Sequence, residues 1–263
     1  FQLARIWSRG ACVHMQRALP LTEDWARRVD SGVVVFFASL LGVTEIPREQ
    51  IFMKCRDGGF GFGSAAARGP AALLASWEVG MRAAAAELGE TTAVGLWRRW
   101  TGLGRALSTA DAAQGRLAGG RAPQADRWQG LLEGRKGTYQ KTYTGRAQEY
   151  ATKAYLATLP AVEAAAVHGA SGSSAGAWLD NFEGVSPLAD HAFFIAAKRR
   201  MHLPLLLVEG PCENRAAAGP NRALVLAGPR CGRQVDVHCV HALNCPRGGG
   251  PVRRHNAVRD AVA

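Results

Sequence analysis

Long apolar runs are scarce in this chain of 263 residues. The longest uninterrupted ones, such as Val33 to Ala38, are much shorter than the roughly 20 residues that a membrane-spanning helix needs. The N-terminus also lacks the basic stretch followed by a longer apolar one that is typical of a signal peptide. We therefore expect an intracellular protein with no membrane partner.

Acidic residues are few compared with basic ones. The chain has 21 Asp and Glu against 32 Lys and Arg, a formal net charge of +11. This surplus excludes an acidic solvating protein and favours a polyanionic partner, because basic surfaces attract phosphate backbones. Nucleic acid, either RNA or DNA, is the expected partner, and an incidentally basic protein is the alternative.

Helical patterns dominate the first 207 residues. Hydrophobic residues make up 48% of the chain, which is enough to bury a core. Thr22 and Ser64 stand as N-caps at the start of apolar-periodic stretches, while Gly42 and Pro160 stand where such stretches end. We predict a mainly α fold, in which an irregular helical region is followed by a small Cys/His segment that resembles a zinc knuckle.

Glycine-rich stretches predict irregular backbone. Residues 102–137 contain many glycines, so we expect short helices and loops there. In residues 58–63 glycine alternates with phenylalanine but lacks the spacing of a phosphate-binding loop, which favours a short strand or tight packing against backbone. The helical pattern dissolves between Val208 and Arg230. We therefore predict a helical region at 1–207, a linker at 208–230 and a Cys/His segment at 231–263.

Cysteines and histidines gather near the C-terminus. A long chain without an export signal is expected to keep its thiols reduced, which favours a metal site over disulfides. If this stretch is helical, the spacing of His241 and Cys245 places both on one face, and Gly232 permits a turn that aims Cys231 at them. His238 is an alternative ligand to Cys239, because Cys239 and His241 crowd each other. Free thiols on a loop are the alternative to a metal site. Because zinc prefers four thiolate or imidazole ligands, we predict one structural zinc ion. Its predicted ligands are Cys231, Cys239, His241 and Cys245.

Two basic regions are candidate nucleic-acid contacts. In residues 135–153 five cations accompany one acid, Glu149, and all four tyrosines lie in or just past this window. Cations that bind phosphates and rings that stack on bases are what single-strand binding requires. Half-buried tyrosines opposite solvated cations are an equal alternative. Arginines that directly follow the Cys/His cluster favour phosphate contacts as well. The predicted nucleic-acid-binding residues are Arg135, Lys136, Lys141, Arg146, Lys153, Arg247, Arg253 and Arg254.

Catalytic groups do not form a recognisable pattern. The acids are scattered, with no paired carboxylates of the kind that hold metal ions for phosphoryl transfer. The serines of residues 171–174 lie in a Gly/Ser stretch without the strand and helix that flank a serine nucleophile. The chain alone is therefore predicted to have no catalytic residues.

The C-terminal motif carries a resemblance to a known family. It starts at Cys231 and reads C-G-x3-D-x4-H-A-L-x-C-x2-G-G-x4-R-H-N-x2-R-D. This resembles the segment after the polymerase in non-LTR retrotransposon polyproteins, which join a reverse transcriptase to a restriction-like endonuclease. Residues 58–62, 177–179 and 198–201 fit the same region. The resemblance implies a thumb- and linker-like region at 1–207, a zinc knuckle that helps to hold element RNA or target DNA, and an endonuclease domain that opens at 254–256.

Two departures from the family pattern bear on function. Pro229 occupies the place of the family's first cysteine, so that Cys239 must substitute or the site is degenerate. The polymerase's paired aspartates are absent, and the endonuclease's acids and lysine are expected beyond Ala263. The resemblance thus implies a fragment that positions nucleic acid in the nucleus, with the rest of the polyprotein as partner. A minimal metal-dependent nuclease that uses His255 and zinc, or a decayed structural piece, are the alternatives.

Overall fold

The computed structural model describes most of the chain in two compact units. The described residues are 10, 13–119, 127–134, 140–173, 175, 179, 190–206, 208–213 and 230–245. The two units are Phe1–Leu188 and Ala189–Ala263, so the division falls before the predicted boundary at residue 207. Helices are the predominant secondary structure of the described residues, which confirms the mainly α fold. In the described residues, no helix is long and apolar enough to cross a bilayer.

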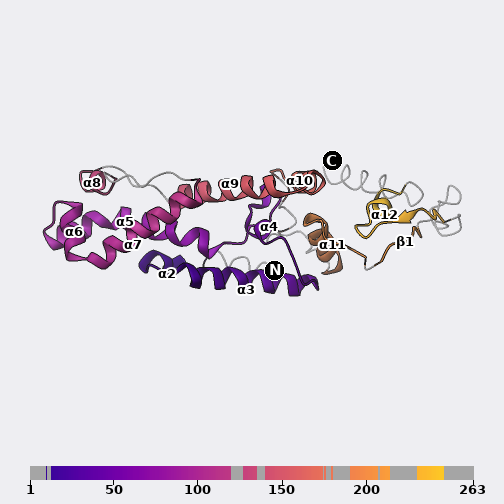
Figure 1. The fold of residues 1–263 in the computed structure, drawn as a ribbon, viewed down its shortest axis with the longest axis horizontal. Helices are drawn as coiled ribbons and strands as arrows, with labels where there is room; N and C mark the ends of the chain where they lie inside the picture. Colours follow the sequence, from indigo (N-terminus) through magenta and orange to yellow (C-terminus); the bar gives the residue numbers. More distant parts are fainter. Residues whose placement is uncertain are drawn as a thin grey trace, which may run out of the picture. The chain divides into compact units, whose positions relative to one another are not determined.

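All secondary-structure elements in the described residues of the first unit are helices (Figure 1). The 3-10 turn η1 (Cys55–Asp57) follows α4. The α-helices are α2 (Val13–Ala18), α3 (Glu23–Leu41), α4 (Arg48–Phe52), α5 (Ala65–Leu88), α6 (Ala93–Arg99), α7 (Thr101–Leu117), α8 (Arg127–Leu132), α9 (Gln140–Thr158) and α10 (Ala161–Gly169).

Capping residues begin α3 and α5 and end α3 as the sequence predicts. The Thr22 hydroxyl accepts a hydrogen bond from the Trp25 amide at 3.2 Å, and α3 ends at Gly42 in the left-handed conformation. The Ser64 hydroxyl accepts from the Ala67 amide at 3.0 Å at the start of α5. Each cap satisfies a backbone group that the helix itself leaves unpaired.

Helix α5 is the centre of the first unit. It packs against α2, α3, α7, α8 and α9. Its apolar face contributes Leu74 and Met81 to a core that also receives Leu107 from α7 and Trp128 from α8. The core also receives Tyr143 from α9, which fixes the rotation of α9 and hence the face that it exposes.

The glycine and phenylalanine alternation at 58–63 is a packing motif. Phe60 and Phe62 are buried against the Phe37 ring, with centroids at 4.8 and 5.5 Å. The Phe60 amide donates to the Gln50 carbonyl at 3.1 Å, and a Cβ on Gly59 would collide with Met53. The chain passes so close to α4 that only glycine fits, which confirms tight packing and not a strand.

The prediction for residues 102–137 is wrong over its first half. Helix α7 runs unbroken from Thr101 through three glycines to Leu117. At Gly104 a Cβ would lie 3.1 Å from the Trp97 Cβ, so glycine lets α6 approach α7 closely. Tertiary packing therefore outweighs the low helix propensity of glycine.

The second unit combines two short helices with a two-stranded ribbon. Its elements are α11 (Asp190–Arg200), β1 (Gly210–Pro211), β2 (Gln234–Val235) and α12 (Val240–Asn244). The strands are antiparallel, with Gly210 opposite Val235 and Pro211 opposite Gln234. The segment predicted as a linker, 208–230, thus supplies one strand of the ribbon.

Candidate metal centre

The β-ribbon brings two cysteines together that are far apart in sequence. Cys212 directly follows β1, and its amide donates to the Arg233 carbonyl at 2.7 Å. The Gly232 amide in turn donates to the Cys212 carbonyl at 3.1 Å. Because these bonds continue the ladder beyond the paired strands, Cys212 lies beside Cys231.

An ion pair reinforces this approach. The residues next to the two cysteines, Glu213 and Arg230, form a salt bridge at 2.7 Å. Both side chains are more than half exposed, so the bridge contributes at most about 1 kcal/mol. The backbone hydrogen bonds of the ribbon are therefore the main interaction that holds Cys212 beside Cys231.

A glycine turn and a helix place the remaining ligands. Gly232 has φ +70°, a conformation that glycine adopts without strain, and it turns the chain directly after Cys231. His241 lies in α12 and Cys245 is its C-cap residue. The four-residue spacing on a helix therefore presents both side chains on one face, as the sequence predicts.

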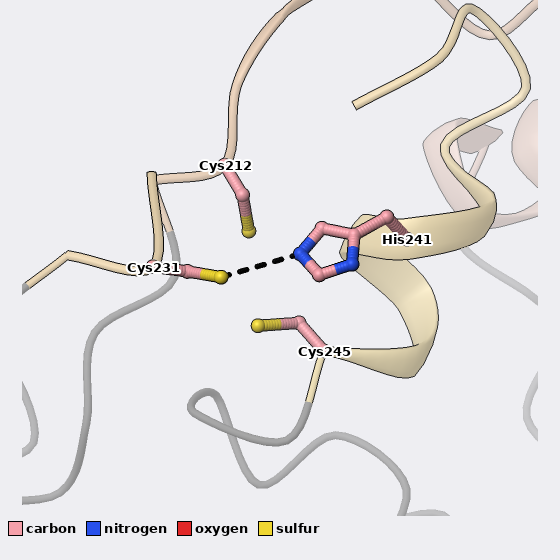
Figure 2. Close-up of side chains that lie close together, drawn as sticks. All are labelled: Cys212, Cys231, His241 and Cys245. Atoms are coloured by element: carbon pink, nitrogen blue, oxygen red, sulfur yellow. Dashed lines mark hydrogen bonds between the residues drawn. The ribbon is translucent and has the colours of Figure 1, made fainter. Parts of the chain in front are cut away.

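These four residues form a compact Cys3His cluster (Figure 2). The three Sγ atoms and one His241 ring nitrogen all lie within 4.8 Å of one another. The Cys231 Sγ and the His241 Nε2 are 3.3 Å apart. Cys212 and Cys245 are almost fully buried and pack with Val235, so the cluster is also the core of this part of the unit.

The cluster fits a tetrahedral metal ion. Bond lengths of about 2.3 Å to sulfur and 2.0 Å to nitrogen place ligand atoms about 3.5 to 3.8 Å apart at the corners of a tetrahedron. The atoms of the cluster need to move by only about an ångström to reach those positions. Three thiolates and an imidazole are soft or borderline donors, unlike the oxygen ligands that magnesium and calcium prefer. The Cys3His cluster can therefore hold one metal ion.

One predicted ligand is corrected by the structure. Cys239 is outside the cluster and Cys212 takes its place. Cys239 is the N-cap residue of α12, and it lines an apolar hollow together with Leu206 and Val235. Burial raises the pKa of the Cys239 thiol, Asp236 raises it further, and Arg199 opposes the shift.

The alternative ligand His238 is not part of the Cys3His cluster. Its ring stacks on the His202 ring, with centroids 4.2 Å apart and planes within 9°. Its amide donates to the Asp236 Oδ1 at 2.8 Å, and the Cys239 amide donates to the Asp236 carbonyl at 2.9 Å. Burial acts to raise the pKa of Asp236, but backbone amides including that of His238 outweigh it and hold this pKa below the ordinary value. Asp236 thus shapes the turn that leads into α12.

Sequence reasoning missed Cys212 because it lies in the predicted linker. One signal was present: Pro229 stands where a first cysteine is expected, and Cys212 is the next cysteine towards the N-terminus. Cys212 supplies the fourth ligand from a different strand.

The predicted nucleic-acid-binding residues divide into two sets. Lys141, Arg146 and Lys153 are exposed on α9. The others lie outside the described residues, as do Pro229 and the motif beyond Cys245; they are Arg135, Lys136, Arg247, Arg253 and Arg254.

The comparisons with known proteins add no relative. No protein-family model, no curated protein and no solved structure matches the chain.

Proposed function

We propose that this chain is a nucleic-acid-binding fragment of a retrotransposon reverse transcriptase and endonuclease. It positions element RNA or target DNA and has no catalytic activity alone. The Cys3His cluster is the observation that carries the proposal, because three of its members, Cys231, His241 and Cys245, belong to the motif on which the resemblance rests. A fourth ligand from Cys212 removes the objection that Pro229 leaves the site one cysteine short.

Zinc is the metal that this donor set favours. A closed set of four protein ligands, with no position left for water or substrate, is typical of structural rather than catalytic zinc. The ion would hold β1, β2 and α12 together, since Val235, Cys212 and Cys245 are the buried residues of this cluster. The bound ion would thereby fix the position of Cys245, the residue from which the following part of the protein continues.

The charge of the chain supports nucleic acid as the partner. A net charge of +11 favours phosphate contacts, and the cations of α9 are exposed. Within the parent polyprotein, such a fragment would act in the nucleus beside the polymerase and the endonuclease.

Salt dependence of binding tests the proposal. The full chain, purified with zinc, is titrated into labelled RNA and DNA at salt concentrations between about 50 and about 200 mM. We expect the affinity to fall steeply with salt, since each neutralised phosphate releases counterions. Replacement of Arg253 and Arg254 by glutamine should weaken binding to all sequences alike. Affinity that does not change with salt, or an absence of binding, would contradict the proposal.

A further inference from the structure

The described tyrosines of α9 have different environments. Tyr143 is buried, and its hydroxyl donates to the Glu78 Oε1 at 2.5 Å. Tyr155 is half-buried, and burial together with Glu49 and Glu163 raises its pKa to about 12. Tyr150, in contrast, is 49% exposed. Of these three tyrosines, Tyr150 is therefore the one that can offer its ring to a ligand.

The Tyr150 ring is held against the end of α7. A Cβ on Gly119 would lie 2.9 Å from both Cδ2 and Cε2 of Tyr150, so the ring lies directly on this glycine. Gly119 also has φ +84°, a conformation that other residues rarely adopt. One side of the ring is thus covered by backbone while about half of the side chain remains open. A ring positioned in this way loses little conformational freedom when a ligand stacks on it.

Two cations flank Tyr150 on the same face of α9. Arg146 precedes it by four residues and Lys153 follows it by three, so all three side chains lie on one stripe along the helix. Both cations are exposed. Lys153 pairs with Glu149 at 2.9 Å, but both side chains are about two-thirds exposed or more, and such a pair is weak. The stripe therefore presents cation, ring and cation at successive turns.

Lys141 lies on a different face of the same helix. It precedes Tyr150 by nine residues, a rotation of about 180° at 3.6 residues per turn. The neighbouring Gln140 side chain accepts hydrogen bonds from Arg17 of α2 at 3.0 and 3.3 Å. Lys141 is thus exposed and cationic but is not part of the stripe.

We infer that the stripe of Arg146, Tyr150 and Lys153 binds single-stranded nucleic acid, with one base stacked on Tyr150 and the adjacent phosphates held by the two cations. This inference rests on the nucleic-acid binding proposed above. A single strand fits better than a duplex, because a duplex keeps its base faces stacked inside and offers only phosphates to the stripe.

Substitutions at Tyr150 test the stacking. The full chain is titrated into a short labelled single-stranded oligonucleotide, as RNA and as DNA, and into the duplex of the same sequence. Tyr150→Leu should raise the Kd for the single strand about 5- to 150-fold, and should leave the duplex Kd unchanged. Tyr150→Phe keeps the ring and should keep the affinity. The RNA and DNA arms show which single strand is preferred.

Charge variants on one helix supply the matched controls. Lys153→Gln should weaken single-strand and duplex binding alike, since it removes a phosphate contact. Lys141→Gln makes the same change on a different face and should weaken both affinities by less than Lys153→Gln does. Circular dichroism of each variant shows whether α9 is intact.

The outcomes separate this inference from the function on which it rests. If the wild-type chain binds with the expected salt dependence but Tyr150→Leu binds the single strand equally well, stacking on Tyr150 is wrong and nucleic-acid binding stands. Equal losses on single strand and duplex would also contradict stacking. If the wild-type chain binds neither, both proposals fail.

Discussion

Replacement of Cys212 by serine should disrupt the metal centre. The substitution removes one of three thiolates from the Cys3His cluster and leaves a hydroxyl at a position that is 2% exposed. Serine replaces a soft thiolate by a poor zinc ligand. The matched variant is Cys239→Ser, since Cys239 lies close to the cluster but outside the ligand set.

The expected loss of zinc-binding free energy follows from the number of ligands. A structural zinc ion contributes about 10 to 16 kcal/mol, so that one of four equal ligands carries about 2.5 to 4 kcal/mol, or about two to three orders of magnitude in Kd. Burial of the Val235 side chain contributes only about 2 kcal/mol. We therefore expect the ribbon and α12 to lose their structure together with the metal.

Competition with a chelator of known affinity measures the zinc Kd of each variant, and limited proteolysis reports the fold of residues 208–245. Cys212→Ser should lose affinity by the factor given above and become susceptible to protease. Cys239→Ser should retain the zinc affinity and the protease resistance of the wild-type chain. The reverse result, with zinc lost from Cys239→Ser and kept by Cys212→Ser, would refute the ligand assignment.

Three further predictions concern the first unit. Gly59→Ala forces a methyl group into Met53 and should cost about 1 to 3 kcal/mol, measured by urea unfolding. Burial raises the pKa of Asp30, although the Ser64 hydroxyl at 2.7 Å and the backbone amides of α5 act against the shift. Because the folded pKa is raised, the stability due to Asp30 is complete below its ordinary pKa and falls as the pH rises through the folded value. Asp30→Asn should remove this fall, which unfolding curves at several acidic pH values would show. Absorbance titration should find a tyrosine step at a pKa of about 12, and Tyr155→Phe should abolish that step.

Local signals in the sequence predicted several helix ends. Thr22, Ser64 and Gly42 act within one turn of their own position, so their effect does not depend on the rest of the fold. The spacing of His241 and Cys245 is equally local, and their place on one face of α12 follows from it.

Features that depend on distant contacts were not predictable in this way. Helix α7 stays continuous through its glycines while it packs against α5 and α9, and no local pattern reveals those contacts. Cys212 joins the cluster because β1 pairs with β2, and two-residue strands leave no recognisable alternation in the sequence. Cys239 lies closer to His241 in sequence, yet the turn at Asp236 leaves it outside the cluster.

X-ray absorption at the zinc edge of the Cys239→Ser chain tests the central claim most directly. The Cys3His cluster predicts a zinc-to-protein ratio of about one, with three sulfur ligands at about 2.3 Å and one nitrogen at about 2.0 Å. A site that retains only two sulfur ligands, or a chain that no longer binds zinc, would contradict the assignment of Cys212, Cys231, His241 and Cys245 as the metal ligands.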